Sequence, residues 1–240
     1  MEFIITFIYG LIIGSFLNVC IYRIPLGISV VFPRSACPSC GKPIKAYDLI
    51  PVISFLILRG KCRNCKAVIG WQYPLVELLA GVLTGVLYLK FGLSIIFLKA
   101  VILCYLLIIV SFIDLKYKRI PNLITYPGII IALIGAVFFG KNGFYNAFFG
   151  LLVGGGILFP IAYFYPQGMG FGDVKLLALI GAFLGVKLVL YSLFIGSILG
   201  TVIGLILIAM KFITRKTTIP FGPFLASGAV ITILIFGFGG

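Results

Sequence analysis

The chain has 240 residues, of which 62% are hydrophobic and 10% are charged, and its formal net charge is +14. Soluble domains are about 45–50% apolar and about 25% charged, so this composition argues against a soluble globular domain, a disordered chain and a nucleic-acid-binding domain. The sequence contains no histidine and only five acidic residues, which excludes most acid–base mechanisms before any motif is considered. The acidic residues are Glu2, Asp48, Glu77, Asp114 and Asp173.

Eight apolar segments are candidates for membrane-spanning helices, because a span needs about 20 mostly apolar residues. The sixth segment is short and contains glycine, which leaves a tilted, broken or re-entrant helix open. The chain is therefore expected to be an all-α polytopic membrane protein with about eight transmembrane helices. The segments cover residues 3–21, 73–89, 95–113, 123–139, 145–165, 174–187, 188–210 and 223–240.

The distribution of Lys and Arg predicts the orientation of these helices, because cytoplasmic loops carry the excess of positive charge. Eight spans with the N-terminus outside place fifteen Lys and Arg on the cytoplasmic side and four on the other. The fifteen are Arg23, Arg34, Lys42, Lys45, Arg59, Lys61, Arg63, Lys66, Lys116, Lys118, Arg119, Lys175, Lys211, Arg215 and Lys216, and the four are Lys90, Lys99, Lys141 and Lys187. Residues 22–72 are then cytoplasmic, and the positive charge is assigned to the lipid surface rather than to nucleic acid.

The first apolar segment is predicted to be an uncleaved helix rather than a signal peptide. A signal peptide carries positive charge before its apolar core and a small-residue cleavage site after it. Here Glu2 precedes the core and Arg23 follows it, which is the opposite order of charge.

Four of the six cysteines form two Cys-x-x-Cys pairs, Cys37 with Cys40 and Cys62 with Cys65. Two such turns complete a four-thiolate tetrahedral site, which suits zinc or iron, and four protein ligands leave no position open for catalysis. Disulfides are disfavoured on the cytoplasmic side, and redox pairs usually accompany a βαβ pattern that is absent here. The sequence therefore predicts a small structural zinc domain between the first two membrane helices.

Asp114 and Asp173 fall at the cytoplasmic ends of the third and sixth predicted spans. A carboxylate close to hydrocarbon is costly, so it indicates a function by default. Each residue also has a structural interpretation. Asp114 could be an interfacial residue paired with Lys116 or Lys118, and Asp173 could be the N-cap of its helix.

Three alternating glycines, Gly168, Gly170 and Gly172, come directly before Asp173 and favour the functional interpretation. They allow a tight turn and the close approach of another backbone, such as an extended substrate. Two neighbouring carboxylates share a proton, so that one activates water as a general base and the other polarises a scissile carbonyl. This chemistry requires no histidine.

At this point the motifs resemble the bacterial type IV prepilin peptidases, the leader peptidase/N-methyltransferases, over nearly the whole chain. The Gly-x-Gly-Asp motif at 170–173 is weak alone, because presenilin and signal peptide peptidase share it, but the order of all the blocks is specific. The blocks are GSFLNVCIYRIP at 14–25, the two Cys-x-x-Cys pairs, DLIPVISFLILRGKCRNC at 48–65, YPLVELL at 73–79, the Asp114 segment, GFGDVKLLALIGAFLG at 170–185 and IPFGPFLASG at 219–228.

The resemblance implies an aspartyl endopeptidase of the bacterial inner membrane, with Asp114 and Asp173 as the catalytic pair. Its substrates would be prepilins and pseudopilins, whose leader peptides are cut after Gly at the cytoplasmic face. The resemblance also implies methylation of the new N-terminus with S-adenosylmethionine and associates residues 22–72 with this activity. A Gly-rich Rossmann fingerprint is absent, so the residues that bind this cofactor stay unknown. Asn122 is a departure, because relatives often have Asp at this position.

The predicted division of the chain is a first helix at 1–21, a zinc domain at 22–72 and a peptidase domain at 73–240. Four further residues are candidates for supporting roles at these sites: Gly170, Gly172, Lys175 and Glu77. For Lys175, a position at the membrane interface is favoured over tuning of the aspartates or binding of an acidic substrate residue. Glu77 is expected to pair with Arg23 or another base, or to lie near the methyl-donor site.

Two other functions compete with the peptidase. A proton-coupled transporter could use Asp114 and Asp173 as a relay, but such proteins commonly show inverted repeats and midplane carboxylates, and neither pattern is found in the sequence. A non-catalytic membrane adaptor could dock through its zinc domain, but that function leaves the Gly-x-Gly-Asp segment unexplained.

Overall fold

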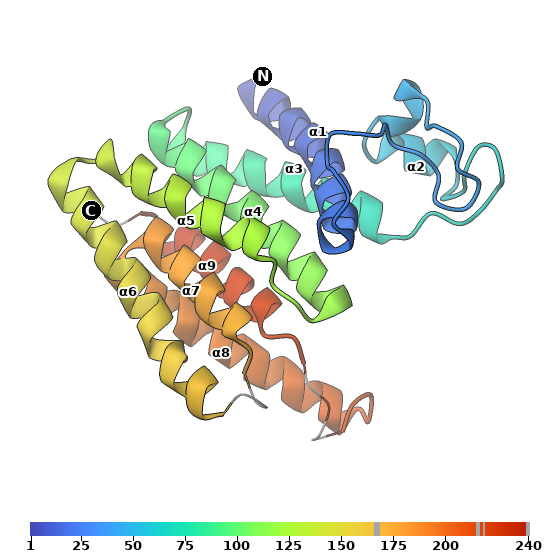
Figure 1. The fold of residues 1–240 in the computed structure, drawn as a ribbon. Coiled ribbons are helices and arrows are strands. Elements are labelled where there is room, and N and C mark those ends of the chain that lie inside the picture. The colour runs from blue at the N-terminus through green and yellow to red at the C-terminus, as the bar shows by residue number, and fades with distance from the viewer. Residues whose placement is uncertain (166–168, 215–216, 218, 239–240) are drawn as a thin grey trace. The chain divides into compact units, whose positions relative to one another are not determined.

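The computed structural model describes residues 1–165, 169–214, 217 and 219–238, and within them the fold is helical, with isolated β-bridges in place of strands (Figure 1). The expected all-α polytopic architecture is thereby confirmed. Some predicted features lie outside the described residues, namely Gly168, Arg215, Lys216 and the end of the last predicted span at 239–240.

Eight helices correspond one to one with the eight predicted apolar segments. Five of them, α1, α3, α4, α6 and α8, are long and apolar enough to cross a membrane, whereas α5, α7 and α9 have 16, 14 and 15 residues. The total of eight spans and the orientation therefore stay predictions. The bounds are α1 Glu2–Arg23, α3 Gln72–Phe91, α4 Ile95–Tyr117, α5 Asn122–Val137, α6 Gly140–Phe164, α7 Phe171–Leu184, α8 Val186–Ala209 and α9 Gly222–Phe236.

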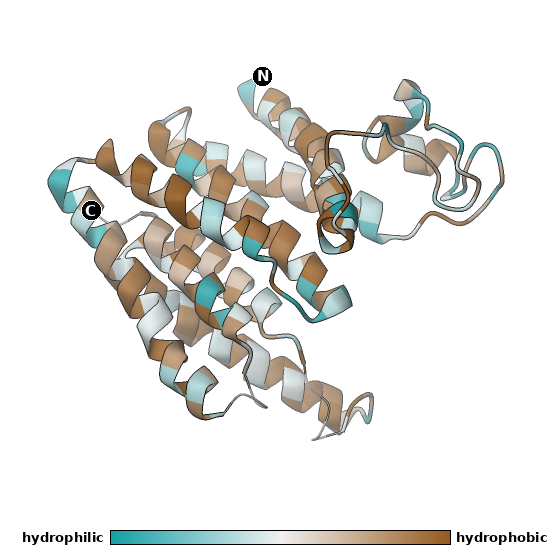
Figure 2. Cartoon of the chain, viewed as in Figure 1, coloured by the Kyte–Doolittle hydropathy of each residue, from teal (hydrophilic) through white to brown (hydrophobic). Residues whose placement is uncertain are grey.

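The surfaces of these helices are apolar. Figure 2 shows hydrophobic residues along the long helices and hydrophilic residues mainly at helix ends and in the segment that contains α2. Leu89, Phe194 and Leu205 are each more than 60% exposed. A soluble protein rarely exposes so continuous an apolar surface, and a lipid environment explains it.

The first of two compact units covers residues 1–97 and is built on the packing of α1 against α3. A Cβ at Gly14 would lie 2.7 Å from the Cα of Glu77, so the missing side chain lets the two helices approach closely. The segment between α1 and α3 carries only short helices, which are η1 Ile24–Leu26, η2 Ala46–Leu49 and α2 Ile53–Ile57. This segment holds the four paired cysteines.

The second unit covers residues 98–240, and glycines again lie where its helices cross. Gly150 of α6 and Gly181 of α7 face each other so closely that neither position has room for a Cβ. Gly196 of α8 lies in the same way against α9, where a Cβ would meet the Phe224 carbonyl oxygen at 2.8 Å. The close α6–α7 contact fixes the helix that carries Asp173.

The sixth predicted segment is shifted by three residues, because it was expected at 174–187 and α7 covers Phe171–Leu184. The cause is Gly185, whose φ of +83° suits glycine and separates α7 from α8. Asp173 consequently lies inside the helix rather than before it. The predicted division into 1–21, 22–72 and 73–240 concerns which segment carries which activity, and it stays a prediction.

Candidate functional site

Asp114 lies near the C-terminal end of α4 and is 6% exposed. Its Oδ2 accepts a hydrogen bond from the backbone N–H of Gly222, the first residue of α9, at 3.1 Å. A Cβ at Gly222 would lie 2.7 Å from the same oxygen, so this contact requires glycine. The ammonium of Lys116, a predicted partner of Asp114, lies over the Tyr117 ring instead. The N-terminus of a helix also carries partial positive charge, which favours a carboxylate at this position.

Asp173 is the third residue of α7 and is partly buried. The N-cap of this helix is Gly170, so the interpretation of Asp173 as the N-cap is wrong. The Asp173 carboxylate lies within electrostatic range of the Asp114 carboxylate. The structure therefore brings together two acidic residues that are 59 positions apart in the sequence, both within the second unit.

The residues around Asp173 have distinct environments. A Cβ at Gly172 would lie 3.1 Å from the Cβ of Ile120, whereas a Cβ at Gly170 would lie 3.8 Å from the backbone nitrogen of Gly172. Lys175 donates a hydrogen bond from Nζ to Oδ1 of Asn122 at 2.9 Å. This contact ties α7 to the start of α5 and gives Lys175 a partner that sequence reasoning missed.

The four paired cysteines form one cluster, in which the Sγ atoms of Cys37, Cys40, Cys62 and Cys65 all lie within 4.8 Å of one another. Cys37 Sγ and Cys65 Sγ are 3.8 Å apart. Tetrahedral zinc with Zn–S bonds of about 2.3 Å requires sulfur atoms about 3.8 Å apart, so the donor set fits this metal. Backbone N–H groups of Cys40 and Ser39 lower the pKa of the Cys37 thiol to about 6, which favours the thiolate that a metal binds.

Both Cys-x-x-Cys turns have the same backbone pattern. In the first, the Cys37 N–H donates to Lys42 O and the Gly41 N–H donates to Cys37 O. In the second, the Cys62 N–H donates to Ala67 O and the Lys66 N–H donates to Cys62 O. This repeated geometry directs both sulfur atoms of each turn to the same point.

An ion pair between Arg63 and Asp48 stabilises the segment that holds the cysteines. Arg63 donates from Nη2 to Asp48 Oδ1 at 2.7 Å and from Nε to Oδ2 at 2.9 Å. The Arg63 guanidinium holds the pKa of the Asp48 carboxyl below its ordinary value. Asp48 therefore links η2 to the second Cys-x-x-Cys turn.

Glu77 of α3 is 7% exposed, and its Oε2 accepts a hydrogen bond from the Val52 N–H at 2.8 Å. The predicted partner Arg23 donates instead to the carbonyl oxygens of Ser29 and Pro33, at 2.9 and 2.8 Å. Glu77 thus joins α3 to the cysteine-containing segment.

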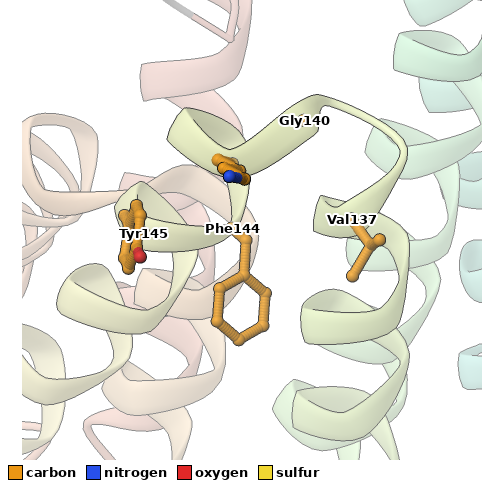
Figure 3. A pocket seen from close by; sticks show the side chains of 5 residues that line it. Val137, Gly140, Phe144 and Tyr145 are labelled. Carbon is orange, nitrogen blue, oxygen red and sulfur yellow. The ribbon is translucent and has the colours of Figure 1, made fainter.

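Two cavities of about 500 Å³ stand out among the described residues. One lies at the turn between α5 and α6, where the side chains of Val137, Phe144 and Tyr145 make an apolar lining (Figure 3). The other lies inside the first unit and is lined by residues that include Glu77 and Asn18. Asn18 was missed by sequence reasoning, although a buried amide in an apolar helix was a signal that could have found it.

Comparison with known proteins agrees with the resemblance found in the sequence. Residues 8–91 match the model of the bacterial peptidase A24 N-terminal domain, and residues 101–205 match that of the type IV leader peptidase family. Two proteins named prepilin leader peptidase/N-methyltransferase, from Pseudomonas aeruginosa and Bacillus subtilis, are each 34% identical to this chain. The alignments cover 95% and 96% of this chain and 89% and 93% of the relatives. This chain belongs to the type IV leader peptidase family.

A third relative with the same name, from Aeromonas salmonicida, is also 34% identical, over 98% of this chain and 91% of its own length. No solved structure shows a significant match. Membership of the family identifies the chain as an enzyme of the leader peptidase class, and its apolar helices make it a multi-pass membrane protein. Asp114 and Asp173 both lie in the region that matches the peptidase family.

Proposed function

We propose that the chain is an aspartyl endopeptidase that removes the leader peptides of prepilins and pseudopilins, with Asp114 and Asp173 as its catalytic pair. The observation that carries the proposal is the buried Asp114 carboxylate, held by the Gly222 N–H within electrostatic range of Asp173. Both residues lie in the region that matches the peptidase family, and three relatives carry the corresponding name.

In peptide hydrolysis, one aspartate would act as the general base and the other as the protonated hydrogen-bond donor. An N–H donor stabilises an ionised carboxylate, so we assign Asp114 as the base that takes a proton from the attacking water. Asp173 would be the protonated partner and would donate a hydrogen bond to the scissile carbonyl oxygen. The tetrahedral intermediate then collapses as the leaving amine takes up a proton.

The substrate would reach the pair as an extended segment that is cut after Gly. The surroundings of Gly170 support this idea, because among the described residues a Cβ there would have only the Gly172 backbone nitrogen close to it, at 3.8 Å. The predicted orientation puts these residues at the cytoplasmic face of the inner membrane, and the positive-inside rule supports that orientation.

The second proposed activity is N-methylation of the newly exposed N-terminus, which the names of the relatives support. S-adenosylmethionine would supply the methyl group. The new N-terminal amine would take up this methyl group and lose a proton, and the demethylated thioether would leave. Zinc held by Cys37, Cys40, Cys62 and Cys65 would keep the segment between α1 and α3 folded.

Cleavage of a purified prepilin by the full-length protein in detergent tests the aspartate pair. Asp114→Asn and Asp173→Asn should each abolish cleavage, because either change removes the charge or the proton that the mechanism needs. Glu2→Gln is the matched control and should cleave like the wild type, because Glu2 lies at the start of α1 in the other unit. Full cleavage by either aspartate variant would contradict the assignment.

Methyl transfer is tested separately with labelled S-adenosylmethionine and a pilin that has already been cleaved. Label should appear on the pilin even with Asp114→Asn, because the peptide bond no longer needs to be cut. If the pilin stays unlabelled, the proposed methyltransferase activity is wrong and only the peptidase activity remains proposed.

A further inference from the structure

The cavity in the first unit is unused by the proposed peptidase chemistry. It has a volume of about 500 Å³ and is bounded by α1, the start of α3 and the segment that holds the cysteines. All its lining residues belong to the unit 1–97, so its shape does not depend on the placement of the second unit. Binding sites for small molecules typically have volumes of about 300–1,000 Å³.

Asn18 is among the residues that line this cavity, and it carries an unsatisfied acceptor. Its side chain is 2% exposed, and Nδ2 donates to the carbonyl oxygens of Tyr73 and Gly14 at 3.0 and 3.4 Å. These two carbonyls fix the amide orientation, because a flipped amide would place its oxygen against them. Oδ1 is buried without a hydrogen-bond partner, and a buried orphan acceptor of this kind calls for an explanation.

Glu77 adds a second acceptor to the same lining. One oxygen of its carboxylate accepts the Val52 N–H at 2.8 Å. A carboxylate that is 7% exposed is costly unless a positive charge lies beside it. Its expected partner Arg23 is turned toward the carbonyls of Ser29 and Pro33. A ligand with a positively charged donor group would satisfy both Glu77 and Asn18.

The rest of the lining is suited to a flat ring and a carboxylate. Phe16, Tyr22 and Tyr73 contribute aromatic surface, and Lys42 and Lys45 contribute positive charge. S-adenosylmethionine combines these features in one molecule, since it has an adenine ring, a carboxylate, an ammonium group and a sulfonium ion.

We propose that this cavity binds S-adenosylmethionine, with Asn18 and Glu77 as acceptors for its positively charged end and with Tyr22 and Tyr73 beside its adenine. The inference rests on the proposed methyltransferase activity and adds the location of its donor site. Because Cys37 and Cys62 also line the cavity, the metal cluster would support one of its walls.

Equilibrium binding of tritiated S-adenosylmethionine to the full-length, metal-loaded protein in detergent tests the proposal. Glu77→Gln and Tyr22→Ala should each weaken binding by about tenfold or more, because each removes a direct contact. Glu2→Gln and Tyr9→Ala are matched controls on α1 that lie outside the cavity, and their binding should stay within about twofold of the wild type. Metal content and melting temperature verify that each variant is folded.

Photo-crosslinking of the labelled compound to the wild type gives a result that does not depend on any variant. Label is expected on peptides that contain residues 15–23 or 69–77. If the wild type binds the compound but the label is found only elsewhere, or if the Glu77 and Tyr22 variants bind normally, the location is wrong. If the wild type cleaves prepilin and binds no S-adenosylmethionine, the proposed methyltransferase activity itself fails.

Discussion

Gly222 has no side chain, and the Asp114 carboxylate occupies the space that a side chain would need. The hydrogen bond from its N–H holds the carboxylate at 3.1 Å, and the burial of both residues keeps water from competing for it. The PFGP segment at 220–223 therefore acts on the proposed chemistry through its backbone. We expect this segment to set the orientation of the Asp114 carboxylate, and it adds no charge of its own.

Gly222→Ala should lower prepilin cleavage by about 100-fold, because displacing a catalytic group by about 1 Å has an effect of that size. The added Cβ would lie 2.7 Å from Asp114 Oδ2, so the carboxylate or the start of α9 must move. Steady-state cleavage assays check this prediction. Gly135→Ala is the control, since a Cβ there meets nothing within 4 Å. Equal activity of the two variants would rule out the positioning role of Gly222.

The Asp48–Arg63 pair predicts a specific dependence of stability on pH. Because Arg63 lowers the pKa of Asp48 in the folded protein, the pair contributes fully above the ordinary Asp pKa of about 3.9. That contribution is lost only as the pH falls through the lowered value. Asp48→Asn should therefore lower the melting temperature by the same amount at pH 8, 7 and 6, as measured by thermal unfolding. A difference from the wild type that changes over this range would contradict the prediction.

Some residues of the candidate sites were predictable from the sequence because their signals are local. The four cysteines stand in two short motifs, and metal geometry restricts what such motifs can do. The Asp114–Gly222 contact joins residues 108 positions apart, and the amide of Asn18 is fixed by a carbonyl 55 positions away. Contacts of this kind depend on tertiary packing, so no local pattern could have predicted them.

At the scale of helices, glycine contacts set how closely the elements pack. Without a hydrophobic driving force inside lipid, helices associate through close packing, and small residues make that possible. The α6–α7 contact at Gly150 and Gly181 holds the helix that carries Asp173. The position of Asp173 is therefore linked to a helix crossing at the other end of α7.

Gly150→Ala should destabilise the protein by about 1–3 kcal/mol, the usual result of overpacking. A Cβ there would meet the carbonyl oxygen of Gly181 in α7 and, at 2.7 Å, the Cα of Gly185, which follows α7, and backbone atoms cannot rotate away. Gly156→Ala in the same helix is the matched control. It meets nothing within 4 Å and should be neutral or stabilise α6 by up to about 1 kcal/mol. Thermal unfolding in detergent measures the stability of both variants. Similar melting temperatures for Gly150→Ala and Gly156→Ala would contradict the close α6–α7 contact at Gly150.

Helix positions were predicted better than helix ends. Apolar length alone gave all eight segments, because the composition of a span is a strong signal. The ends at Leu184 and Phe236 are set by Gly185 and Gly237, whose φ values are +83° and +72°. The sequence contains 30 glycines, so the residue type alone does not show which of them adopt these conformations.

At the scale of the whole molecule, the proposed activities fall into different units. The cysteine cluster and the cavity belong to residues 1–97, and the two aspartates belong to residues 98–240. The segment between α1 and α3 has few buried apolar side chains, so its folding should depend on the metal.

Removal of the metal with a chelator should unfold the segment between α1 and α3 while most of the peptidase activity remains. Elemental analysis should find one zinc per chain before treatment. Limited proteolysis should then produce new cuts within residues 28–70, while circular dichroism still reports the long helices. Protein that contains no metal yet resists proteolysis in this segment would show that the cluster is not a structural metal site.

The cysteine cluster also makes an optical experiment possible. Cobalt occupies tetrahedral thiolate sites in place of zinc and, unlike zinc, absorbs visible light. Cys37 and Cys62 border the cavity, so a molecule that enters it would alter the surroundings of two of the four metal ligands. A cobalt-substituted enzyme would then report occupancy of the cavity as a change in colour, inside an intact membrane and without any label on the ligand.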